Sequence, residues 1–317
     1  MEAEEKTVRF VGIDVAKNRV DVHVRPDGAR FGCATDSAGL AELIRRLGPL
    51  APRLIVLEAS GGYEGVVLAA LAEAGLPVAA VNPLQIRRFA GAIGKLAKTD
   101  TIDAAVIAHF AEAVRPEPRA LPNDLTLRLR ELLARRHQLV VMGQAEGQRL
   151  DKVEQRIAQR SCRTVLRALE AERKRIEAAI DKLVQSSPLW RAKENLMRTV
   201  PGVGPTVARV FIAHLPELGT LDRHKVAALA GVAPINRDSG QYRCKRRIHG
   251  GRVHLRAPLY MACLVAVRHN PPLRTFYSRL KQAGKPTRVA IVATMRKLLI
   301  ILNAMLRDNT PWTEVHA

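Results

Sequence analysis

Four acidic residues in the first third of the chain stand where their carboxylates could hold a metal ion. Asp14 interrupts the apolar run "FVGIDV", and Glu58 ends the run "RLIVLE". Asp100 and Asp103 open a helix pattern, and their three-residue spacing places both carboxylates on one helical face. Strand ends and a helix start can converge at one edge of a sheet, where hard oxygen donors suit Mg²⁺ or Mn²⁺. The four acids therefore predict a divalent-metal site that assists phosphoryl transfer.

Each of these acids also has a simpler structural interpretation. Asp100 and Asp103 can be helix N-terminal acids that the helix dipole favours. Glu58 can end its strand at the solvent. Asp14 is harder to explain in this way, because a charge inside an apolar run is costly without a partner. It is the four acids together, in this order, that favour the metal site.

A second candidate for chemistry is Ser239, in the stretch "APINRDSGQYRCKRR". Its hydroxyl lies beside Gly240 and ahead of a dense cationic run. Such a serine is either a turn residue beside a solvated basic stretch or a nucleophile, with guanidinium groups stabilising the charge that develops on an attacked phosphate. From the residues alone both interpretations stay open. The basic residues that we expect to contact nucleic acid here are Arg237, Arg243, Lys245, Arg246, Arg247, Arg252 and Arg256.

The charge of the whole chain points to a polyanionic partner. Its 317 residues contain 51 Lys and Arg against 30 Asp and Glu, a net charge of +21. Nucleic acid is the first candidate and an anionic membrane the second. The N-terminus "MEAEEKTVRF" lacks the apolar core of a signal peptide, and Arg296 and Lys297 interrupt the late apolar segment. We therefore expect no membrane partner and a cytoplasmic location.

Residues 1–118 alternate strand and helix patterns. Two strand-like runs flank a polar turn at Lys17-Asn18, and "RFGCAT" is a third strand. A helix with Asp36 or Ser37 as its cap, the strand "RLIVLEA", the helix "YEGVVLAALAEAG", the strand "LPVAAVN" and the helix "TDTIDAAVIAHFAEAV" follow. Three strands and then helix–strand–helix–strand–helix is the order of a ribonuclease-H-like domain, a mixed sheet with helices packed on it.

The proline-rich segment "RPEPRALPND" marks a boundary, after which residues 119–189 form a helical connector. The chain from Leu125 to about Ser186 is predicted as long helix, with the alternating four-three spacing of a coiled coil after Cys162. One interpretation is a solvated helical hairpin or dimer stalk, and the other is a basic arm that lies on nucleic acid.

Residues 190–317 are predicted to be mainly helical. In "LMRTVPGVGPTVARVFIAHL" a turn with Gly202 and Gly204 separates two helical segments, as in a helix-hairpin-helix. The backbone N–H groups of such a turn can approach a phosphate. Glycines also close ordinary helix corners, so this motif is a weak signal by itself.

Several long motifs together resemble one family. "FVGIDVAKNRVDVHV", "VLEASGGYEG", "KLAKTDTIDAAVIAHF", "TVPGVGPTVA", "LAGVAPINRDSG" and "HLRAPLYMAC" occur in the order found in transposases of the insertion sequence 110 family. The resemblance implies a RuvC-like DEDD domain in residues 1–118, a helical connector, and a C-terminal transposase domain in residues 190–317. It also implies that Asp14, Glu58, Asp100 and Asp103 bind metal and that Ser239 is the nucleophile.

The same resemblance implies the partners. The expected substrates are the double-stranded DNA of the element ends and of the target, and the expected guide is a structured RNA that the element encodes. We also expect a homo-oligomer in the bacterial cytoplasm, associated with the nucleoid. Two other functions remain open, a RuvC-like junction-resolving nuclease in which water attacks, and a nucleic-acid-binding protein without catalysis.

Overall fold

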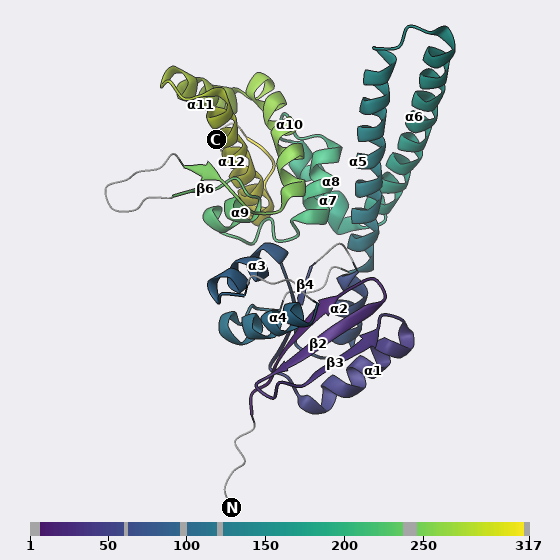
Figure 1. Ribbon diagram of the computed structural model, residues 1–317. Helices are drawn as coiled ribbons and strands as arrows, with labels where there is room; N and C mark the ends of the chain where they lie inside the picture. The colour runs from purple at the N-terminus through teal and green to yellow at the C-terminus, as the bar shows by residue number, and fades with distance from the viewer. Residues whose placement is uncertain (1–6, 60–62, 96–99, 119–122, 237–245, 314–317) are drawn as a thin grey trace, which may run out of the picture. The chain divides into compact units, whose positions relative to one another are not determined.

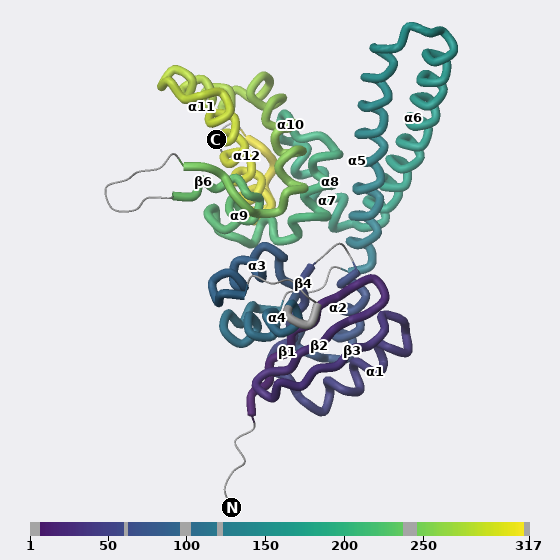
Figure 2. The backbone as a smooth tube through the Cα atoms, viewed as in Figure 1, coloured from purple at the N-terminus to yellow at the C-terminus, as the bar shows by residue number. Residues whose placement is uncertain are grey.

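The chain folds into two compact units, residues 1–121 and 122–317 (Figures 1 and 2). The structure is a computed structural model that describes residues 7–59, 63–95, 100–118, 123–236 and 246–313. For residues 100–102 it describes the backbone alone. Each unit has its own hydrophobic core, so each is described by itself.

The first unit is a five-stranded mixed sheet with the strand order β3-β2-β1-β4-β5. β1 pairs antiparallel with β2 and parallel with β4, which in turn pairs parallel with β5. The elements are β1 (Phe10–Val15), β2 (Arg19–Arg25), β3 (Arg30–Ala34), α1 (Ser37–Leu47), the short 3-10 helix η1 (Gly48–Leu50), β4 (Leu54–Glu58), α2 (Glu64–Glu73), β5 (Val78–Val81), α3 (Pro83–Ala92) and α4 (Asp100–Val114). The predicted fold of this part, a mixed sheet with helices, is confirmed.

Helices cover both faces of this sheet because both faces of its central strands are apolar. Val11 and Ile13 of β1 lie in one core with residues of α1 and α2. Phe10 of β1 and Val56 of β4 lie in the other core with residues of α3 and α4. Successive side chains of a strand point to opposite faces, so this division fixes the face of every other strand residue.

Helix α3 was not predicted, although the sequence carries a signal for it. Asn82 is the N-cap, and its side chain accepts a hydrogen bond of 2.8 Å from the backbone N–H of Leu84. Pro83 follows as the first helical residue, where its missing N–H costs nothing. An Asn-Pro pair after a buried strand is therefore a helix start here.

The described residues of the second unit form helices and one short β-ribbon. Its elements are α5 (Asp124–Leu150), α6 (Arg156–Gln185), α7 (Pro188–Arg198), α8 (Pro205–His214), α9 (Arg223–Leu229), β6 (Pro234–Ile235), β7 (Arg247–Ile248), α10 (Val253–His269), α11 (Pro271–Gln282) and α12 (Thr287–Asp308). Helix α12 is long and apolar enough to cross a membrane by length and composition. Ten of its residues are buried, because it is the central helix of this unit's core.

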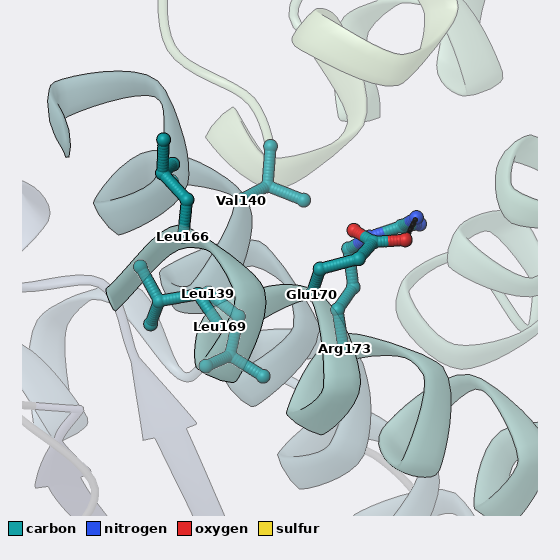
Figure 3. A pocket seen from close by; sticks show the side chains of 7 residues that line it. Leu139, Val140, Leu166, Leu169, Glu170 and Arg173 are labelled. Carbon is teal, nitrogen blue, oxygen red and sulfur yellow. Dashed lines mark hydrogen bonds and ion pairs between the residues drawn. The ribbon is translucent and has the colours of Figure 1, made fainter. Parts of the chain in front are cut away.

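Helices α5 and α6 form a long hairpin (Figure 1). The long helical segment predicted from Leu125 to about Ser186 consists of two helices, because the chain turns back at residues 151–155 without a proline or glycine. Leucines of both helices line a pocket between them, and Glu170 and Arg173 lie side by side at its edge (Figure 3). Of the two interpretations of this segment, the hairpin describes its fold.

Candidate active site

Three carboxylates lie in one row across the sheet of the first unit. In the parallel pair β1–β4, Ile13 is the register partner of Leu57, so Asp14 and Glu58 come next to one another. In the antiparallel pair β1–β2, Asp14 is directly opposite Asp21. Neighbouring strands are about 4.8 Å apart. We call Asp21, Asp14 and Glu58 the carboxylate row.

The carboxylate row faces helix α4. Gly12, two residues before Asp14, lies on the α4 face, because a Cβ added there would stand 2.1 Å from the backbone nitrogen of Ala108 and 2.3 Å from the carbonyl oxygen of Ala104. The guanidinium of Arg115, just after α4, lies over the ring of Phe10 at 5.5 Å. Since the late part of α4 meets the start of β1, the helix runs antiparallel to the strand.

That direction brings the first turn of α4 toward the strand end that carries the carboxylate row. Asp100 and Asp103 stand in this first turn. Parallel pairing and an antiparallel helix are thus the two features that place Asp14, Glu58 and the first turn of α4 at the same edge of the sheet.

Of the four acids predicted to bind metal, those whose side chains are described are half-buried rather than deeply buried. Asp14, Glu58 and Asp103 are partly exposed, and each has a polar or electrostatic partner. The side chain of Asp100 lies outside the described part of the chain. Within the described part, no three His, Cys, Asp or Glu side chains stand close enough to hold a metal ion. The donors at this edge are carboxylate oxygens, the ligand type that Mg²⁺ and Mn²⁺ prefer.

Asp21 is an acid that the sequence analysis missed. Its carboxylate accepts hydrogen bonds from Arg19, 2.8 Å from Nη2 and 3.1 Å from Nε. The guanidinium lies over Gly32 of β3, where a Cβ would come within 3.0 Å of it. Like charges directly opposite one another destabilise a strand pair, so this arginine offsets the repulsion between Asp21 and Asp14. The hairpin turn at Lys17-Asn18 was the signal that could have placed Asp21.

The proposed nucleophile Ser239 lies outside the described residues, as do Arg237, Arg243 and Lys245. The structure describes the two ends of the segment that carries them. Pro234 pairs with Ile248 and Ile235 with Arg247 in the ribbon β6–β7. The segment between these residues is therefore anchored at both ends by one antiparallel ribbon. Arg246 and Arg247 lie at its end and are exposed.

Below the ribbon, two glycine-containing turns press against each other. A Cβ on Gly251 would stand 2.2 Å from the backbone nitrogen of Gly231, and a Cβ on Gly231 would stand 2.3 Å from the carbonyl oxygen of Gly250. Gly231 and Gly251 have φ values of 69° and 71°, in the left-handed region that glycine tolerates. Both reasons exclude any side chain here, and we call this contact the glycine clamp.

Arg252 and Arg256, for which contacts to nucleic acid remain a prediction, also form contacts within the chain at this base. Arg252 forms a bidentate ion pair with Glu217, at 2.6 and 2.7 Å, and donates from Nη1 to the carbonyl of His214 at 2.7 Å. Its backbone N–H donates to Leu229 at 2.8 Å. Arg256 donates to the carbonyl of Gly250 at 3.2 Å. These partners give both arginines a structural role beside the ribbon.

The C-terminal end of α8 is closed by two arginines around His214. Arg130 of α5 donates to the carbonyl of Ala213 at 2.7 Å, next to the Arg252 contact. The ring of His214 stacks on that of His254 at 5.4 Å. Burial first, and then Arg130, His254 and Arg252, lower the pKa of His214 to about 4. A helix C-terminus favours a protonated histidine, but burial and the arginines outweigh it here.

The predicted helix-hairpin-helix turn lies between α7 and α8. Gly202 has a φ of 106°, and a Cβ there would stand 2.8 Å from the carbonyl oxygen of Ala262 and the nitrogen of Ala266. It is therefore a packing glycine against α10. Gly204 is the N-cap of α8, with no side-chain cap and open space where a Cβ would be. Of the two glycines, Gly204 stands where a phosphate could approach the backbone.

A mixed sheet with acids at one edge, joined to a strongly basic helical unit, is the arrangement of an enzyme that transfers phosphoryl groups in nucleic acid. Comparison with known families agrees with this class. Residues 11–158 match the family DEDD_Tnp_IS110, described as "Transposase", and residues 194–278 match the "Transposase IS116/IS110/IS902 family". The chain belongs to the IS110 family of transposases, DNA phosphoryl-transfer enzymes.

Similar proteins match over nearly the whole chain. The "Pilin gene-inverting protein" of Moraxella lacunata is 26% identical and aligns over 96% of this chain and 97% of its own length. An uncharacterised 42 kDa protein of insertion element IS900 from Mycobacterium paratuberculosis is also 26% identical, over 95% and 96%. Among solved structures, Thermus thermophilus RuvC bound to a Holliday junction matches 35% of this chain and 99% of its own, with 18% identity and a TM-score of 0.28.

Proposed function

We propose that this transposase is an RNA-guided DNA recombinase that cuts and rejoins strands through a covalent bond between Ser239 and a DNA phosphate. The observation that carries the proposal is the register that sets Asp14 beside Glu58, on the sheet face where α4 begins with Asp100 and Asp103. Nothing in the packing of the sheet requires this concentration of acids, since like charges at close range destabilise a fold. A divalent cation would compensate them.

In the proposed reaction Ser239 loses its proton and its Oγ forms a bond to phosphorus. The bond from phosphorus to one deoxyribose oxygen breaks, and that oxygen takes up a proton. Rejoining is the reverse reaction with the hydroxyl of another strand. A divalent ion held by Asp14, Glu58, Asp100 and Asp103 would stabilise the charge on the attacking and leaving oxygens.

The segment that carries Ser239 has an anchored base and a cationic surrounding. The ribbon β6–β7 and the glycine clamp hold the described residues on both sides of this segment. Exposed Arg246 and Arg247 stand at one end. We propose that they contact DNA phosphates together with Arg237, Arg243 and Lys245, whereas Arg252 and Arg256 keep the base in place.

The reaction needs residues of both units. The carboxylate row belongs to the first unit and Ser239 to the second, and the two units that contribute them come from one chain or from two chains of a homo-oligomer. An element-encoded RNA as guide is supported by the resemblance to the family. The net charge of +21 provides for contacts to both nucleic acids.

The covalent bond gives the direct test of this proposal. Wild-type protein, guide RNA, Mg²⁺ and cognate DNA are incubated and denatured, and protein that stays attached to DNA is measured. Ser239→Ala should lose the adduct and strand exchange together while it keeps DNA binding, because the change removes only one oxygen from the chain. Ser186→Ala, which removes an exposed hydroxyl bonded to Leu183, serves as the matched control.

A different outcome would favour the nuclease alternative. If Ser239→Ala nicks DNA at a near-wild-type rate in the presence of metal, water is the nucleophile and the chain acts as a RuvC-like nuclease. If wild-type protein neither nicks DNA nor forms an adduct, the binding-only function takes its place.

A further inference from the structure

Helix α6 changes its charge pattern halfway along its length. Residues 156–169 contain four arginines and no acid. Residues 170–185 contain four basic and four acidic side chains. The half nearer the hairpin turn is therefore strongly cationic, and the other half is balanced.

The two halves also differ in their ion pairs. In the balanced half, Arg173 pairs with Glu170 and Glu177 at 2.7 Å each, and Arg175 pairs with Glu172 at 2.6 Å. In the cationic half, no described acid forms an ion pair with any of the four arginines, all of which are exposed. We call these residues the arginine ladder: Arg156, Arg160, Arg163 and Arg167.

The arginine ladder occupies one side of α6. Its spacing of four, three and four residues keeps all four side chains within an arc of about 60°, at about 100° per residue. At about 1.5 Å per residue the ladder is about 16 Å long. Arg160, Arg163 and Arg167 line a shallow depression together with Leu166. Three of the four arginines therefore border the same depression.

This arrangement lowers the stability of the helix that carries it. Like charges three or four residues apart repel each other, and cations in the first turns of a helix oppose its dipole. The helix starts at Gln155 without a side-chain cap bond and without an acid in its first turn. Asp151 and Glu154 lie in the loop before it. Folding alone does not explain the ladder, whereas an anionic partner does.

We infer that the arginine ladder binds the phosphate backbone of double-stranded DNA, at a site separate from the segment that carries Ser239. Its length matches about five base-pair steps of one strand at about 3.4 Å each. Helix α6 contains no aromatic residue, so it lacks the stacking surfaces that sites for single-stranded nucleic acid use. The inference uses the family's action on DNA and does not depend on the proposed nucleophile.

The test compares two charge-matched variants of the same helix. Arg160, Arg163 and Arg167 are changed to Gln in one, and Lys174, Arg175 and Lys182 in the other, so each loses three charges from α6. Binding of the full chain to a DNA duplex of about 30 base pairs is measured over a range of salt concentrations. The ladder variant should bind about 10-fold or more weakly at about 0.1 M salt, and its salt slope should fall by about 2–3. The control variant should stay within about 2-fold of wild type.

Two further measurements make the outcome decisive. The ladder variant should unfold at the same or a higher temperature than wild type, which separates lost binding from lost fold. The corresponding Arg→Lys variant should keep most of the affinity, because a phosphate contact needs charge more than a fork of donors. Equal weakening of both Gln variants would overturn the inference. Unchanged DNA binding with weakened binding to a duplex RNA of the same sequence would also overturn it.

Discussion

Each acid of the proposed metal site can be tested by a single substitution. Asp14→Asn and Asp103→Asn keep the size of the side chain but remove an anionic oxygen ligand. We expect metal-dependent strand cleavage to fall by about 100-fold or more in each variant while DNA binding survives. Asp27→Asn is the control, because this exposed carboxylate pairs with Arg9 at 2.6 Å. Normal recombination by Asp103→Asn would leave that residue as a helix N-terminal acid.

His214 links the fold of the second unit to pH. Its pKa of about 4 in the folded chain lies below the value of about 6.5 expected in the unfolded chain. As pH falls from about 6.5 to about 4, the unfolded chain therefore takes up a proton that the folded chain does not, and stability is lost. The free energy of unfolding should fall by up to about 1.4 kcal/mol per pH unit in this window.

The pH dependence is measured by urea unfolding at several pH values, with His214→Gln as the comparison. The variant lacks this titrating group, so its unfolding free energy should depend less on pH between about 4 and about 6.5. Equal slopes for both proteins would show that the pKa of His214 is the same in the folded and the unfolded chain. The stability of the wild type above about pH 7 does not depend on this group.

At the scale of elements, the glycine clamp packs two turns closely together at the base of the Ser239 segment. Gly251→Ala places a Cβ 2.2 Å from the nitrogen of Gly231, and Gly250→Ala has open space for its Cβ although φ is nearly the same. Gly250→Ala is the control, and it should lower the free energy of unfolding by about 1–2 kcal/mol, because alanine disfavours a left-handed backbone. Gly251→Ala should lower it by clearly more, because the backbone must also move. Denaturant unfolding measures the difference, and equal losses would show that the two turns separate easily.

At the scale of the whole molecule, net charge governs the affinity for DNA. With a charge of +21, binding to a non-cognate duplex should be driven mainly by neutralisation of phosphates. Affinity should fall by about 10³-fold or more between about 50 and about 200 mM salt if six or more phosphates are contacted. A fluorescence titration across this range checks the prediction. A flat salt profile would show that the charge excess is spread too thinly to define a DNA-binding surface.

The sequence by itself determined the type of fold and most of the candidate chemistry. Alternating and continuous apolar runs predicted the strands of the first unit, and helix periodicity predicted most of its helices, because burial demands these patterns locally. The same patterns marked Asp14 and Glu58, since a charge at the end of an apolar run is conspicuous. Family motifs then gave Ser239 a role that its own neighbours left open.

The tertiary structure decided which residues meet. Parallel register set Asp14 beside Glu58, and antiparallel register added Asp21, which the hairpin turn at Lys17-Asn18 could have placed. Pairing across strands depends on chain segments far apart in sequence, so single-residue preferences do not contain it. For the same reason the sequence did not show which residue Arg252 pairs with inside the chain. Its partner Glu217, 35 positions earlier, became visible in the folded chain alone.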